Sequence, residues 1–137
     1  MGEMYLKYQT ITIQQANSMN PQVLAFVGDS VYTLYVRTHL ATHHGEKSGV
    51  LHQLANAYVK AKGQSDVVAE IESDLTEEEL AIYKRARNYK TKSVAKNQNV
   101  VDYHRATGLE ALVGYLYLTG QEERLDWLLS KVIKENV

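Results

Sequence analysis

The chain contains a single proline, Pro21, and no other proline interrupts the sequence as far as Val137. Pro21 follows Asn20, and an Asn N-cap with proline at the first helical position is a strong signal for a helix start. Apolar residues then recur at helical spacing, not in the alternation of a strand, at Val23, Leu24, Val27, Val31, Leu34 and Tyr35. The sequence therefore predicts an all-α fold.

Further start and stop signals divide the chain into about six helices. Thr76 and Glu79 have the spacing of a capping box, and Gly45, Gly63 and Gly120 are expected to end helices. The predicted helices cover about 21–43, 48–63, 65–71, 77–88, 102–118 and 121–135, with a polar loop at 89–101. No repeat or linker is evident, so we expect a compact bundle in one domain, 1–137.

The composition of the chain excludes several classes of protein. The chain has no cysteine, so disulfides and thiolate metal sites are excluded. No secretory leader opens the sequence, and no apolar run is long enough for a bilayer span. We therefore expect a soluble, cytoplasmic protein. The formal net charge of −1 taken alone argues against nucleic-acid binding.

Charge is unevenly distributed along the chain, however. Residues 70–79 carry acids without a basic residue, whereas 84–96 carry six cations without an acid. A local basic segment of this kind can bind phosphate groups, although it is also compatible with a solvated loop. The candidate RNA-binding cations are Lys84, Arg85, Arg87, Lys90, Lys92 and Lys96, with Arg105 as a weaker candidate.

Two carboxylates, Asp29 and Glu110, stand inside apolar helical runs, and each has a glycine nearby, Gly28 and Gly114. Glycine inside a helix costs about 1 kcal/mol relative to alanine, so it often marks close approach of another backbone. If the helices met at these glycines, the two acids would come together and repel unless a cation lay between them. A hard divalent ion would satisfy both and could activate water at a phosphoryl group. Alternatively, Asp29 lies on a solvated face with Thr33 or Arg37, and Glu110 does the same beside Thr107.

Both runs resemble motifs of the ribonuclease III family. LAFVGDSVYTLYVR (24–37) is similar to its signature helix, and TGLEALVGYLYL (107–118) is similar to its second motif. The order and separation of the motifs also match. The chain looks most like the Mini-ribonuclease III branch, which consists of the nuclease domain without a double-stranded-RNA-binding domain.

The resemblance assigns catalytic and metal-binding roles to Asp29 and Glu110. Three further positions that carry acids in the family hold Ala25, Thr107 and Gln22 here, which leaves the number of metal ions open. The resemblance further implies Mg²⁺ (with Mn²⁺ as a substitute), a homodimer, and cleavage of double-stranded RNA to products with 5′-phosphates. It also implies a role in maturation of large-subunit (23S) ribosomal RNA, for which a ribosomal protein is a candidate helper.

Two other functions compete with this interpretation. His39 and His43 lie one helical turn apart, the spacing of a two-histidine zinc site, but no third ligand is obvious. A non-catalytic helical protein that binds RNA or assists ribosome assembly could share the same fold. Cleavage of a long RNA duplex in Mg²⁺, with and without chelator, separates the enzyme from the binding protein.

Overall fold

The computed structural model describes residues 8–45, 47–90 and 99–133. These residues form seven α-helices and a 3-10 turn at Glu72–Asp74, which confirms the all-α prediction. The helices are α1 (Ile13–Ser18), α2 (Pro21–His43), α3 (Ser48–Val59), α4 (Ala61–Ile71), α5 (Glu77–Arg87), α6 (Val100–Leu118) and α7 (Glu122–Leu129). No helix in the described part of the chain is both long and apolar enough to span a bilayer.

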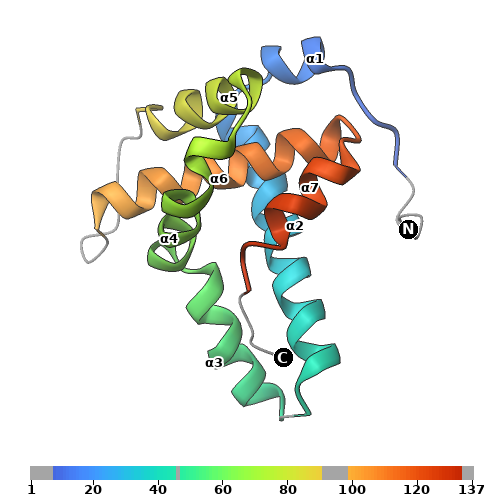
Figure 1. The fold of residues 1–137 in the computed structure, drawn as a ribbon, viewed down its shortest axis with the longest axis vertical. Coiled ribbons are helices and arrows are strands. Elements are labelled where there is room, and N and C mark those ends of the chain that lie inside the picture. Colours follow the sequence, from blue (N-terminus) through green and yellow to red (C-terminus); the bar gives the residue numbers. More distant parts are fainter. Residues whose placement is uncertain (1–7, 46, 91–98, 134–137) are drawn as a thin grey trace.

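Helix α6 is the centre of the fold. Every residue from Ala111 to Leu116 is buried, because a helix that is apolar all round must be covered on all sides. Figure 1 shows α6 crossing the middle of the molecule, with α5 along one side and the long α2 running across it. Beyond this crossing, the second half of α2 and helix α3 extend together as a helical hairpin (Figure 1).

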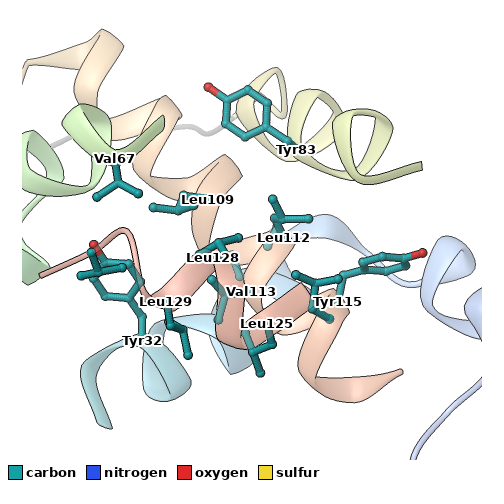
Figure 2. Packing of buried hydrophobic residues seen from close by; sticks show 14 of the residues in the cluster. Tyr32, Val67, Tyr83, Leu109, Leu112, Val113, Tyr115, Leu125, Leu128 and Leu129 are labelled. Atoms are coloured by element: carbon teal, nitrogen blue, oxygen red, sulfur yellow. The ribbon is translucent and has the colours of Figure 1, made fainter. Parts of the chain in front are cut away.

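The core is assembled around α6 from several helices. Tyr32 of α2, Val67 of α4 and Tyr83 of α5 all pack in the same cluster as Leu109 and Leu112 (Figure 2). Helix α7 closes the cluster with Leu125, Leu128 and Leu129. Each fully buried leucine contributes about 1.5–3 kcal/mol relative to an exposed one, so this cluster holds the crossing helices in place.

Local signals correctly predicted several helix starts. Asn20 accepts a hydrogen bond from the Gln22 amide at 2.8 Å, as expected of an N-cap. The capping box of α5 is also present, because Thr76 and Glu79 exchange side chain-to-backbone hydrogen bonds of 2.9 and 3.2 Å. The Glu79 carboxylate is also bound by Arg124 of α7 at 2.7 and 2.8 Å, so one side chain both caps α5 and ties it to α7.

Other boundaries differ from the prediction. Helix α3 ends at Val59 instead of Gly63, and α4 begins at Ala61, so Gly63 lies inside the first turn of α4. Helix α6 begins at Val100, two residues before the predicted start, because Asn99 caps it with a 3.1 Å bond from the Asp102 amide. These shifts are local and do not change the helix order.

The ends of the chain hold the largest discrepancies. Helix α7 stops at Leu129, whereas the prediction continued to Glu135, whose position lies outside the described residues. Ser130 follows it, and its hydroxyl donates to the Trp127 carbonyl at 2.6 Å, a local bond that competes with helix continuation. The sequence reading also missed α1, which is short but buries Ala16 completely.

Candidate active site

Helices α2 and α6 cross at their two glycines. A Cβ atom on Gly28 would overlap the backbone carbonyl of Glu110, and one on Gly114 would overlap the carbonyl of Leu24. A Cβ on Gly114 would also lie 3.1 Å from the Gly28 nitrogen. The backbones therefore touch at this crossing, as the glycine positions predicted, and no side chain larger than hydrogen fits between them.

This close approach brings Asp29 and Glu110 to one cleft. Asp29 is exposed beside Gly28, whereas Glu110 is largely covered. Both line a cleft of about 230 Å³ with Gln22, Ala25, Phe26, Tyr103 and Thr107. Asp29 does lie on an exposed face of α2, and that face forms one wall of the cleft that it shares with Glu110.

The setting of Glu110 disfavours its charged form. Burial raises the pKa of the Glu110 carboxyl well above its usual range, and the adjacent Asp29 carboxyl raises that pKa further. A single hydrogen bond, from the amide of Gln64, acts in the opposite direction and lowers the pKa of Glu110. Two acids that share a site in this way cannot both ionise easily unless positive charge is added.

Gln64 was not singled out from the sequence. Its side chain is 2 % exposed, and its Nε2 donates to the Val59 carbonyl at 2.8 Å and to Glu110 Oε2 at 3.2 Å. Tyr32 is a second neighbour that sequence reasoning missed as a site residue. Its phenol is buried, and nearby Glu110 adds to burial in raising the pKa of Tyr32. Both residues come from distant parts of the chain, so no local pattern linked them to Glu110.

The three positions at which the resemblance led us to expect acids surround the same cleft. Gln22, Ala25 and Thr107 line it together with the two carboxylates. The Thr107 hydroxyl donates to the Tyr103 carbonyl at 3.0 Å and so serves its own helix. Among the described residues, no group of three or more His, Cys, Asp and Glu is arranged to hold a metal ion. Asp29 and Glu110 are the two carboxylates among the residues that line the cleft.

The structure brings two of the predicted RNA-binding cations together. Arg87, at the end of α5, and Arg105 of α6 line one hollow of about 370 Å³ with Tyr83, His104 and one acid, Glu72. Residues 104 and 105 face this hollow while residues 103 and 107 face the cleft, so the two depressions lie on neighbouring faces of α6. We call the first depression the basic hollow.

The other predicted cations have different settings. Lys84 and Lys90 are exposed, whereas Lys92 and Lys96 lie outside the described residues. Arg85 is exposed but its guanidinium is engaged, because it donates to the carbonyls of Asn17 at 2.6 Å and Met19 at 3.0 Å. Arg85 therefore ties α5 to the end of α1, and its predicted contact with RNA stays untested.

The two-histidine zinc site gains no support from its surroundings. The rings of His39 and His43 stack with centroids 4.0 Å apart. His43 Nδ1 lies 2.9 Å from the His39 carbonyl and 3.0 Å from the Thr42 hydroxyl, so it already has hydrogen-bond partners within its own helix. Both histidines instead border a large apolar groove, described below.

Comparison with known proteins identifies the family of this chain. The family model described as the Ribonuclease III domain matches residues 22–121, which include both carboxylates of the cleft. A crystal structure of a protein from Fusobacterium nucleatum is 34 % identical and superposes with a TM-score of 0.75, covering 82 % of this chain and 90 % of the other.

Curated relatives share a more specific name. Mini-ribonuclease 3 of Brevibacillus brevis is 50 % identical over 109 residues, which cover 80 % of this chain and 81 % of the relative. Mini-ribonuclease 3 of Clostridium tetani is 40 % identical over 130 residues, which cover 94 % of this chain and 86 % of the relative.

Proposed function

The chain belongs to the ribonuclease III family of endoribonucleases, and we propose that it cuts double-stranded RNA with divalent metal held by Asp29 and Glu110. The observation that carries the proposal is the α2–α6 crossing, where Gly28 and Gly114 let the two helix backbones touch. This contact places both acids in one cleft. A fold that needed only to be stable would gain nothing from bringing two like charges together.

The residues of the cleft suit a hard cation. Oxygen ligands are what Mg²⁺ and Mn²⁺ prefer, and Mg²⁺ keeps several of its waters. Two carboxylates in an open cleft leave room for such waters and for phosphate oxygens. When bound, the metal would supply an activated water and would neutralise charge on the phosphoryl group. The number of metal ions per site is left open, because three positions of the cleft, Gln22, Ala25 and Thr107, contribute no charge.

The residues of the chain itself have three further roles in this proposal. Asp29 and Glu110 provide negative charge at a defined point, and the Gly28–Gly114 contact fixes the separation of the helices that carry them. The basic hollow, with Arg87 and Arg105, offers cations on the neighbouring face of α6. A-form RNA is recognised mainly through its shape, phosphates and 2′-hydroxyls, so cations beside the cleft suit a duplex backbone.

We further propose that the chain acts as a homodimer. An apolar groove of about 710 Å³ runs along α2, lined by Phe26, Val31, Leu34 and Tyr35 and closed by Leu125 of α7. Phe26 is 76 % exposed and Leu34 is 54 % exposed. Large apolar side chains gathered on one face mark a protein–protein contact more often than chance. Two such sites in a dimer would cut the two strands of one duplex.

The biological substrate is proposed from the relatives' name and the family resemblance. We place the protein in the cytoplasm, acting on the 23S ribosomal RNA precursor and leaving 5′-phosphate ends, with a ribosomal protein as a candidate helper. Nuclease activity by this domain alone, 1–137, is part of the same proposal.

One gel tests the proposal against the non-catalytic alternative. Purified protein is incubated with a long RNA duplex in Mg²⁺, in Mn²⁺ and in excess chelator. We expect discrete products with either metal and intact duplex with chelator. Intact duplex under all three conditions, together with a mobility shift showing that the protein binds it, would instead identify an RNA-binding protein on a nuclease fold.

A further inference from the structure

Gln64 is a buried polar side chain that contacts Glu110, and the cleft's chemistry as described so far does not use it. It lies in the first turn of α4 and is 2 % exposed. Its Nε2 makes two hydrogen bonds, to the carbonyl of Val59 at 2.8 Å and to Glu110 Oε2 at 3.2 Å. An amide nitrogen has two N–H donors, so both are in use.

The Val59 carbonyl decides which end of the amide faces Glu110. A backbone carbonyl only accepts hydrogen bonds, so the amide must turn its nitrogen toward Val59. The same nitrogen then faces the Glu110 carboxyl. With the amide reversed, Gln64 Oε1 would face two acceptors at once when Glu110 is ionised. The end of α3 therefore holds Gln64 as a donor toward Glu110.

The arrangement is unfavourable for stability alone. Among the described residues, no hydrogen-bond donor reaches Gln64 Oε1, which is buried. A buried polar atom without a partner is destabilising. Packing alone therefore does not explain the hydrogen bond from Gln64 to Glu110.

The corner between α3 and α4 is built to bring Gln64 to this point. A Cβ atom at Gly63 would overlap the carbonyl of Ala57, so only glycine lets the start of α4 fold back this closely on α3. Tyr32 donates to the Tyr58 carbonyl at 3.3 Å and holds the same end of α3 from the side of α2. Three helices thus fix the donor that meets Glu110 on α6.

We propose that Gln64 is a positioning residue for metal binding, whose amide holds one oxygen of Glu110 so that the carboxylate presents its other lone pairs to the cleft. The proposal rests on the proposed function, in which Glu110 is a metal ligand. An ionised carboxylate has two oxygens and about four acceptor sites, so one bond from Gln64 restricts its rotation without using up its capacity. Partners of this kind orient metal ligands in many proteins.

The structural alternative is that Gln64 only satisfies the last carbonyl of α3. That role predicts a loss of stability on substitution and no change in metal binding. The proposed role predicts weaker metal binding in addition to the loss of the bond to the Val59 carbonyl. Gln64→Met removes both donors with an unbranched side chain of similar length, and Gln64→Leu provides a second, more compact apolar replacement. Ser65→Ala changes the adjacent buried residue and serves as the matched control.

The test measures two properties on the full chain. The first is the dissociation constant for Mn²⁺, followed by electron paramagnetic resonance without RNA, and the second is the melting temperature in chelator. We expect Gln64→Met and Gln64→Leu to raise the Mn²⁺ dissociation constant by roughly 10-fold or more. Their melting temperatures should fall by several degrees at most, through loss of the bond to the Val59 carbonyl, and Ser65→Ala should bind Mn²⁺ normally. The Mg²⁺ concentration for half-maximal cleavage should rise in parallel with the dissociation constant.

Two results would overturn the proposal. One is normal Mn²⁺ binding by both Gln64 variants with a lower melting temperature. The other is failure of both variants to fold. Each of these two results would show that the Gln64 amide serves only the end of α3. Failure of the proposed function looks different, because then the wild-type chain itself would bind no Mn²⁺ and leave duplex RNA intact.

Discussion

Glu110 is subject to opposing influences from its neighbours. Burial and the Asp29 carboxyl raise its pKa, whereas the Gln64 amide lowers it. Helix α6 cannot move Glu110 out of this setting, because the crossing at Gly28 leaves no spare space. The cleft therefore holds a carboxyl whose ionisation depends on added positive charge, which is a suitable condition for a site that binds metal together with its substrate.

A second buried carboxylate, Glu79, gives a pH-dependent contribution to stability. Burial opposes its ionisation, but hydrogen bonds from Arg124 and Thr76 outweigh burial and lower the pKa of Glu79 below its usual value of 4.5. A lowered folded-state pKa means that the stabilisation is present above about pH 4.5 and is lost as the pH falls through the folded-state value.

We therefore expect Glu79→Gln to lower the free energy of unfolding by about 1–3 kcal/mol at pH 7. The difference from the wild type should shrink as the pH falls below about 4. Urea unfolding at pH 7 and at pH 3.5 measures both values. A difference that stays constant between the two pH values would contradict the assignment.

Arg85 and Lys84 are adjacent basic residues with different expected roles. Arg85→Ala removes the bonds to the Asn17 and Met19 carbonyls, so it should lower the melting temperature. Lys84→Ala, at an exposed neighbouring position, should leave the melting temperature unchanged. If Lys84 contacts a phosphate, its loss should reduce the slope of the logarithm of duplex affinity against the logarithm of salt concentration by about 1.

Thermal melts and binding titrations at several salt concentrations separate the two residues. A melting temperature unaffected by Arg85→Ala would remove the assigned link between α5 and α1. An unchanged salt slope for Lys84→Ala would place Lys84 outside the RNA-binding surface.

At the scale of elements, the α2–α6 crossing is the feature on which both fold and site depend. Gly28→Ala and Gly114→Ala each place a methyl group against backbone atoms, and backbone cannot yield as a side chain can. We expect each to destabilise the protein by about 1–3 kcal/mol or more, as overpacking does. Both should also reduce cleavage, because the helices that carry Asp29 and Glu110 must separate.

Gly49→Ala is the matched control, because nothing lies within 4 Å of its added Cβ in helix α3. It should stabilise the chain by about 0.4–1 kcal/mol and leave cleavage unchanged. Chemical unfolding and a cleavage assay on all three variants provide the comparison. Wild-type stability in Gly28→Ala would show that the helices do not meet as closely as described.

The sequence contained enough information to predict the α2–α6 crossing, but not the buried residues that contact Glu110 there. Asn20, Pro21 and Thr76 act through hydrogen bonds within one turn, so their helix starts could be read locally. The glycines beside Asp29 and Glu110 predicted a close approach of helices. Gln64 gave no such signal, because its contact with Glu110 joins residues 46 positions apart in the chain. The same limit explains Arg85, whose carbonyl partners lie 66 and 68 positions away.

At the scale of the whole molecule, the apolar groove along α2 predicts self-association. Leu34→Glu places a charge at a position that lines the groove and is 54 % exposed. A buried unpaired charge strongly opposes association, so the variant should sediment as a monomer where the wild type sediments as a dimer. Val50→Glu, at a 43 % exposed position outside the groove, should remain a dimer. A wild-type monomer of 15.5 kDa at micromolar concentration would contradict the dimer.

The most direct test of the central claim removes the charge of each site carboxylate without changing its shape. Asp29→Asn and Glu110→Gln are compared with the wild type for cleavage of a long RNA duplex in Mg²⁺, with duplex affinity and melting temperature measured on the same samples. We predict that each variant melts and binds duplex like the wild type but loses cleavage by a factor of about 100 or more. Cleavage near the wild-type rate by either variant would contradict the assignment of that carboxylate to the active site.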